Sequence, residues 1–125
     1  MPPPPILVVD DSPSVRRMVA ACLRADGFEV IESPDAGRAL GLAEAQEFAM
    51  VLTDQVMPGT DGLSLIRALR AMPRYAGVPV LMLTTESDDG IRARAREAGA
   101  SGFLAKPFDP EQLMASVKAL LAAPA

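Results

Sequence analysis

The sequence predicts a doubly wound α/β domain, (βα)5, in which five parallel strands alternate with five helices. Short apolar runs recur along the chain, and each is followed by a segment with apolar residues at helical spacing. The expected strands are Ile6–Val9, Phe28–Ile31, Met50–Leu52, Val80–Leu83 and Gly102–Ala105. Strict alternation requires crossover connections, so the strands should form one parallel sheet with helices on both faces.

The helices differ in the strength of their sequence signals. The first has Ser12 as its expected N-cap, Pro13 at the first helical position and an apolar stripe from Val15 to Leu23. Three others carry the stripes Ala36–Ala43, Leu63–Leu69 and Leu113–Leu121, the last beginning near Asp109 and Pro110. The segment Asp88–Ala98 has only Ile91, Ala95 and Ala98 as its stripe, which predicts a marginally packed helix.

The length of 125 residues, half of them hydrophobic, is that of one compact domain. Prolines 2 to 5 cannot pair in a sheet and predict a short extended lead-in over residues 1–5. The domain is expected to span residues 6–122, with residues 123–125 as a tail.

Composition argues against several classes of function. The net charge of −4 and the lack of a Lys/Arg block disfavour nucleic-acid binding, because phosphate contacts need clustered cations. No apolar run is long enough to cross a membrane, and the start of the sequence lacks the features of a signal peptide. Cys22 is the sole cysteine, so no internal disulfide forms, and a cytoplasmic location is expected.

Acidic residues follow two of the expected strands. Asp10 and Asp11 come directly after the first strand, and Asp54 comes after the third. Because the carboxyl ends of parallel strands meet at one edge of a sheet, these acids should lie together and repel one another unless a hard cation neutralises them. An all-oxygen cluster of this kind suits Mg²⁺. Asp10 and Asp11 could instead serve only the start of the following helix, and Asp54 only a turn.

Thr84 and Lys106 follow the fourth and fifth strands, so they are expected at the same edge. Each is ordinary alone, because Thr suits strands and Lys suits surfaces. Together with the acids they would supply metal ligands, a nucleophile, a hydroxyl donor and a fixed cation. This is the set of groups that acyl-phosphate chemistry requires.

The residues that carry a family resemblance are Asp10-Asp11, Asp54 with Met57-Pro58 and Asp61-Gly62, Thr84, and Lys106-Pro107-Phe108. Their order and spacing resemble the signature of response-regulator receiver domains, of which the chemotaxis regulator is the single-domain type. The resemblance covers nearly the whole chain. It implies a flavodoxin-like sheet with strand order 2-1-3-4-5, an order that the alternation of elements alone does not give.

The resemblance also implies roles for individual residues. Asp54 resembles the phosphoacceptor, Asp11 a direct Mg²⁺ ligand and Asp10 a holder of metal-bound water, while the Val56 carbonyl would complete the protein ligands. Thr84 and Lys106 resemble the groups that hold phosphoryl oxygens. Phe103 resembles the aromatic switch, and the Lys106-Pro107 bond is expected to be cis. Val56 is apolar where some relatives of the family carry a polar side chain, and Thr85 is bulkier than the alanine often found at its position. Val56 and Glu86 resemble the variable positions that tune dephosphorylation, which leaves the phosphoryl lifetime open.

The implied function is that of a two-component signalling receiver, a phosphoacceptor module and not an enzyme that turns over a separate substrate. Its expected partners are a sensor histidine kinase or histidine phosphotransfer protein and a downstream protein target. Phosphorylation would switch the surface formed by Asp88–Ala98, Gly102–Ala105 and the last helix. The unphosphorylated chain is expected to be a monomer.

Other interpretations remain. A phosphatase of the haloacid dehalogenase class needs a second Asp two positions after its nucleophile, where this chain has Ser12 and Val56. A flavodoxin-like FMN carrier needs a phosphate loop after the first strand, and not two acids. The chain could also be a receiver excised from a larger response regulator or hybrid kinase, or a receiver that serves only as an unphosphorylated interaction module.

Overall fold

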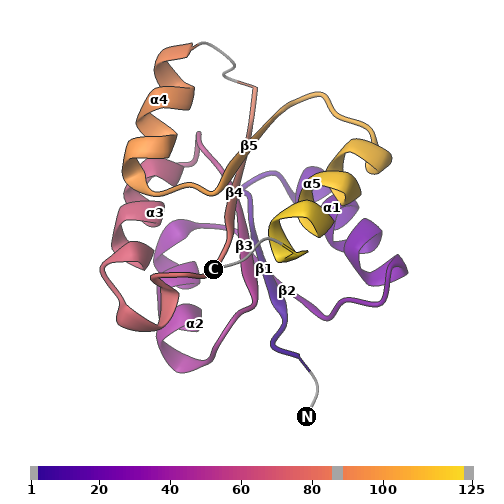
Figure 1. Cartoon of the computed structure of the whole chain (residues 1–125), viewed down its shortest axis with the longest axis horizontal. Helices are drawn as coiled ribbons and strands as arrows, with labels where there is room; N and C mark the ends of the chain where they lie inside the picture. Colours follow the sequence, from indigo (N-terminus) through magenta and orange to yellow (C-terminus); the bar gives the residue numbers. More distant parts are fainter. Residues whose placement is uncertain (1–2, 86–88, 123–125) are drawn as a thin grey trace.

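The computed structural model describes residues 3–85 and 89–122, and it has the predicted (βα)5 architecture (Figure 1). The elements are β1 (Ile6–Val9), α1 (Pro13–Ala25), β2 (Val30–Ser33), α2 (Ala36–Ala45), β3 (Met50–Asp54), α3 (Gly62–Arg70), η1 (Pro73–Tyr75), β4 (Val80–Thr84), α4 (Asp89–Ala98), β5 (Gly102–Ala105) and α5 (Pro110–Ala122). All strand pairs are parallel, and the order β2-β1-β3-β4-β5 confirms the flavodoxin-like plan. No helix in the described ranges has the length and apolar character needed to span a membrane.

The helices cover the two faces of the sheet, with α2, α3 and α4 on one side and α1 and α5 on the other (Figure 1). Alternate strand residues enter different cores because successive side chains of a strand point to opposite faces. Leu7 and Val9 belong to the cluster under α2, α3 and α4, while Ile6 and Val8 belong to the cluster under α1 and α5. Burial on both faces explains why the central strands read as continuous apolar runs.

The bounds of β2, β3 and β4 differ from those predicted from the sequence. β2 begins at Val30 and not at Phe28, because Phe28 belongs to the turn after α1: its backbone N–H donates to the carbonyl of Leu23 (3.1 Å), past Gly27 at φ 92°. β3 and β4 each extend to the polar residue at their end, Asp54 and Thr84.

The structure contains a short helix, η1, that the sequence did not predict. The predicted start of the fourth main helix at Asp88, the lead-in residues 1–2 and the tail 123–125 lie outside the described residues. The Lys106-Pro107 peptide bond is cis, as the resemblance implied.

Arg70, the last residue of α3, joins several segments at the edge of the sheet opposite the strands' carboxyl ends. Its guanidinium donates to the carbonyls of Gly99 (2.9 Å), Tyr75 (2.5 Å) and Val78 (2.6 Å) and to Ser101 Oγ (3.1 Å). Burial lowers the pKa of Arg70 from its usual value. One side chain therefore connects the ends of α3 and α4 with the loops before β4 and β5.

We expect Arg70→Ala to lower the free energy of unfolding by roughly 2–4 kcal/mol, because several partly buried carbonyls lose their donor together. Arg67→Ala, which removes an exposed arginine from the same helix, is the matched control and should cost less than about 0.5 kcal/mol. Urea unfolding followed by circular dichroism measures both. Equal losses in the two variants would show that the hydrogen bonds of Arg70 do not contribute to the free energy of unfolding.

Candidate metal and phosphoryl site

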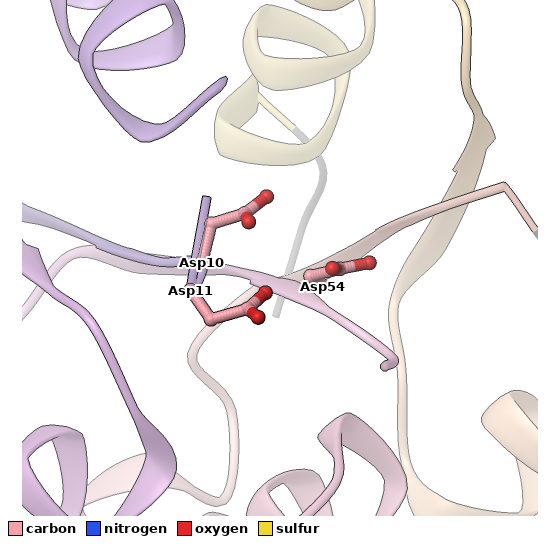
Figure 2. A group of neighbouring side chains, drawn as sticks. All are labelled: Asp10, Asp11 and Asp54. Atoms are coloured by element: carbon pink, nitrogen blue, oxygen red, sulfur yellow. The ribbon is translucent and has the colours of Figure 1, made fainter. Parts of the chain in front are cut away.

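The strand-end residues meet at one edge of the sheet because of the strand register. Val9 pairs with Thr53, so Asp10 lies beside Asp54 at the ends of β1 and β3. In the β4–β5 pair, Thr84 is opposite Ala105, the residue before Lys106. Figure 2 shows the carboxylates of Asp10, Asp11 and Asp54 extending to the same side of these strand ends. The topology thus gathers side chains from four strands into one cluster.

The three carboxylates form a dense cluster of negative charge. Each of Asp10, Asp11 and Asp54 offers an oxygen, and these oxygens all lie within 4.8 Å of one another. Asp10 and Asp54 are buried, 3% and 9% exposed, whereas Asp11 is exposed. Such an arrangement is unfavourable without nearby positive charge, since like charges this close oppose one another's ionisation.

Lys106 supplies positive charge from β5's end. Its Nζ lies 3.0 Å from Asp10 Oδ2 and 3.5 Å from Asp54 Oδ1, and its side chain is 14% exposed. Three carboxylates against one ammonium leave the cluster with a formal charge of −2. A divalent cation would balance that charge, and carboxylate oxygens are the donors that Mg²⁺ prefers. The donor set therefore fits Mg²⁺.

Asp10 has a second set of contacts that fix its position. Its Oδ1 accepts from the backbone N–H of Ser12 (2.9 Å), and its carbonyl accepts from Arg16 (2.8 Å). Arg16 is in turn paired with Glu32 of β2 (3.4 Å). One oxygen of Asp10 therefore supports the backbone at the start of α1, as one interpretation of the sequence predicted, while the other oxygen faces Lys106. The two interpretations of this acid are compatible.

Burial raises the pKa of Asp54 above its ordinary value of 3.8. The positive charge of Lys106 acts in the opposite direction, the charge of Asp10 raises the pKa further, and the hydrogen bond from the Gln55 backbone N–H to Oδ1 (2.8 Å) lowers it. Burial and Asp10 together outweigh the favourable contacts. The folded chain therefore resists ionisation of Asp54 when no metal is bound.

We expect Asp54→Asn to stabilise the metal-free chain at neutral pH. Because the folded-state pKa is raised, the folded chain binds the Asp54 proton more tightly than the unfolded chain does. Wild-type stability therefore falls as pH rises from 3.8 through the folded pKa, and the loss is complete above that pKa. Asparagine does not ionise, so the advantage of the variant should grow over the same interval.

Urea unfolding in EDTA at several pH values measures this difference. Glu44→Gln, which removes an exposed carboxylate from α2, is the control and should show little change. An Asp54→Asn variant that is less stable than wild type at neutral pH would contradict the prediction.

Behind Asp54, Gln55 connects β3 to the start of α3, a role that sequence reasoning missed. Gln55 is buried; its Oε1 accepts from the Leu63 backbone N–H (2.9 Å), and its Nε2 donates to Asp61 Oδ2 (3.3 Å). Asp61 is the N-cap of α3 and accepts from the backbone N–H of Ser64 (2.9 Å). No sequence pattern signalled this role, since only the structure shows that the Gln55 amide is buried and therefore requires partners.

Asp61 and Gly62 both show how closely the start of α3 packs against the end of β3. Burial acts to raise the pKa of Asp61, but its hydrogen bonds with Ser64 and Gln55 outweigh burial and lower it. At Gly62 a Cβ atom would lie 2.3 Å from the carbonyl oxygen of Asp54, so only glycine fits against the strand. The Asp61-Gly62 motif thus sets how closely α3 approaches Asp54.

The other predicted residues occupy the rim and the neighbouring strands. Val56 is 57% exposed just beyond Asp54, and Thr84 is fully buried at the end of β4. Phe103 on β5 is partly buried, with the guanidinium of Arg92 4.8 Å from its ring centroid. Thr85 is exposed, and Glu86 lies outside the described residues. Phe103 is thus next to α4.

Comparison with proteins of known sequence shows relatives over nearly the whole chain. The protein PetR of Rhodobacter capsulatus is 39% identical over 119 residues, which cover 95% of this chain and 49% of PetR. The DNA-binding response regulator MtrA of Mycolicibacterium smegmatis is 39% identical over 116 residues, 93% of this chain and 50% of MtrA. The chain thus spans about half the length of these curated relatives.

Solved structures show the same fold. The chemotaxis protein CheY4 of Vibrio cholerae is 35% identical, with a TM-score of 0.91 over 95% of this chain and 99% of that one. The receiver domain of the sensor histidine kinase PA1611 of Pseudomonas aeruginosa PAO1, solved with a magnesium ion coordinated in its active-site cleft, is 31% identical. Its TM-score is 0.89 over 98% of this chain and all of that one. The family model for the response regulator receiver domain matches residues 6–118. The chain therefore belongs to the response regulator receiver domain family.

Proposed function

We propose that this chain accepts a phosphoryl group on Asp54 in a Mg²⁺-dependent reaction and thereby switches a protein-interaction surface. The observation that carries the proposal is the cluster of three carboxylates with a single lysine, which leaves two negative charges for a cation to balance. Residues 6–122 would form the receiver, with residues 1–5 as lead-in and 123–125 as tail.

The residues that would hold the metal are Asp10, Asp11, Asp54 and the carbonyl of Val56. Asp11, exposed at the rim, would be a direct ligand, and Asp10 would act through metal-bound water. When bound, Mg²⁺ would supply charge neutralisation, which allows an anionic carboxylate to approach an anionic phosphoryl group. The magnesium in the active-site cleft of the PA1611 receiver supports this assignment by similarity.

In the proposed transfer, a carboxylate oxygen of Asp54 forms a bond to phosphorus. The P–N bond of a phosphohistidine on the donor breaks at the same time, and its electron pair stays on the leaving imidazole. Lys106 would donate to one phosphoryl oxygen and Thr84 to another, where negative charge is concentrated. Gln55 and the Lys106 contact hold Asp54 Oδ1, so the carboxylate is already oriented before the donor arrives.

The donor would be a sensor histidine kinase or a histidine phosphotransfer protein, and the receiver would only assist its own phosphorylation and dephosphorylation. The signal would pass through Thr84 and Phe103 to the surface of α4, β5 and α5 and from there to a downstream protein. α4 supports this role because its buried residues are Ile91 and two alanines, Ala95 and Ala98, so the apolar surface that its displacement would expose is small. The unphosphorylated chain would be a cytoplasmic monomer with no nucleic-acid or membrane partner.

Acetyl phosphate tests the reaction without a kinase. With Mg²⁺ the intact-protein mass should rise by one phosphoryl group, and in excess EDTA it should not change. Asp54→Asn should remain unlabelled with Mg²⁺, whereas Asp26→Asn, at a surface pair with Lys118, should label like wild type. Full labelling of Asp54→Asn, or labelling that EDTA does not reduce, would refute the proposal. An interaction-only receiver would show no labelling under any condition.

A further inference from the structure

α4 is a positively charged helix on an acidic protein. Its ten residues carry three arginines, Arg92, Arg94 and Arg96, against two acids, whereas the whole chain has 12 basic and 16 acidic residues. Elsewhere in residues 3–85 and 89–122, acids pair with Arg16, Arg24, Arg38, Lys106 and Lys118. Arg70 and Arg74 donate to backbone carbonyls. Within those same ranges, no salt bridge holds Arg17 of α1, Arg67 of α3 or the three arginines of α4, so α4 is the element on which such cations gather.

Two of these arginines border a hollow between α4 and β5. The hollow has a volume of about 80 Å³ and is lined by Arg92, Ala95 and Arg96 of α4, Ala100 and Gly102 near the start of β5, and Phe103. Arg92 and Arg96 are four residues apart, so they occupy the same side of the helix. Arg94 lies between them in sequence but does not line the hollow.

Phe103 orients one of the two cations. The guanidinium of Arg92 lies 4.8 Å from the ring centroid, a cation–π contact in which the ring supports one face of the planar group. The N–H donors of a guanidinium lie in its plane, so a group held by its face still offers its donors to a carboxylate. The ring contact therefore reduces the conformational freedom that Arg92 would lose on binding an anion.

The lining of the hollow favours an anionic group. Its charged residues, Arg92 and Arg96, are both exposed cations, and Ala95, Ala100 and Gly102 beside them are small. A guanidinium can donate two parallel N–H groups to one carboxylate. The hollow therefore matches an acidic side chain better than an apolar one.

We propose that the hollow between α4 and β5 binds an acidic segment of a partner protein, with a carboxylate held by Arg92 and Arg96. This proposal rests on the proposed function only in that the hollow belongs to the surface of α4, β5 and α5 that phosphorylation would switch. The contacts themselves are present in the unphosphorylated chain. A nucleic acid is the weaker candidate, because its repeated phosphates need an extended run of cations, and this sequence has no Lys/Arg block.

Fluorescence anisotropy with the unphosphorylated full chain in EDTA tests the proposal without involving Asp54. The probe is a fluorescein-labelled peptide rich in Asp and Glu, compared with the same peptide carrying Lys at the acidic positions and with a short DNA duplex. We expect the acidic peptide to bind and the other two not to bind. Because the assay contains no phosphoryl donor, this result is separate from the success or failure of the acetyl phosphate experiment.

The variants distinguish the hollow from general charge attraction. Arg92→Gln/Arg96→Gln should weaken peptide binding about tenfold or more, because a bidentate carboxylate site is lost. Arg94→Gln removes the same kind of charge from the same helix and should weaken binding less than about threefold. Arg92→Lys keeps the charge but loses the planar fork, so its loss should fall between those of the other variants.

Amide NMR spectra check both the folding of the variants and the binding position. The peptide should shift the signals of Gly102 and Phe103 in wild type, and the double variant should keep the dispersed spectrum of a folded domain. Equal weakening by Arg94→Gln, equal binding of the DNA duplex, or no peptide binding would each overturn the proposal. So would sedimentation showing that the chain occupies this surface with a second copy of itself.

Discussion

Asp11→Ala should lower the affinity for Mg²⁺ by about 100-fold or more, because loss of an outer partner alone costs 10- to 100-fold and Asp11 is proposed as a direct ligand. The other two acids remain in the variant, but they already face Lys106, which takes part of their negative charge. The exposed carboxylate of Asp11 is the one that solvent and metal reach most easily.

Calorimetric titration suits this measurement, since the chain has no tryptophan and its single tyrosine is buried under α2, away from the acids. Glu44→Ala removes one negative charge from the surface of α2 and is the matched control. If Asp11→Ala and Glu44→Ala lose affinity equally, Mg²⁺ responds only to overall charge, and Asp11 is no ligand.

Lys106→Ala should lower the free energy of unfolding of the metal-free chain by roughly 2–4 kcal/mol, because it leaves two buried acids without their cation. Mg²⁺ should recover much of this loss, since it would neutralise the same carboxylates. The variant should therefore gain more stability from saturating Mg²⁺ than wild type does. This compensation links the structural role of the lysine to the proposed metal.

Lys118→Ala separates this effect from loss of any ion pair. Lys118 lies 3.3 Å from Asp26, but its side chain is 58% exposed, so its removal should cost less than about 1 kcal/mol. Thermal unfolding with EDTA and with Mg²⁺ compares the two variants. A Lys106→Ala variant whose stability equals that of Lys118→Ala, with no added response to Mg²⁺, would show that solvent already screens the acids.

The sequence was sufficient to place the acids because their position depends on simple rules. Alternating strands and helices impose parallel pairing, and parallel strands bring their carboxyl ends to one edge. Asp10 and Asp54 therefore lie at the same edge whatever the detailed packing of the helices. The adjacency of β1 and β3, which brings the two acids together, was implied only by the family resemblance. The apolar runs likewise identified the strands, because burial on both faces leaves little room for polar residues.

Contacts that depend on exact distances could not be predicted in the same way. The Arg70 contacts reach Gly99 and Ser101, about 30 residues away, and their formation depends on how α3 and α4 end. Nothing in the local pattern separates Arg70 from the exposed Arg67 on the same helix. The closer approach of Lys106 to Asp10 than to Asp54 is set by side-chain geometry, which strand order does not specify.

The ion pair between Lys106 and Asp10 also affects how the domain is made, because its partners lie 96 residues apart in the chain. During synthesis, β1 and β3 emerge long before the lysine does, and burial of a carboxylate without a cation costs several kcal/mol. Close packing of the two acidic strand ends is therefore opposed until β5 has left the ribosome. A nascent chain that stops short of Lys106 should keep this edge open to water, so the cluster of carboxylates and lysine is completed only when nearly the entire domain has been translated.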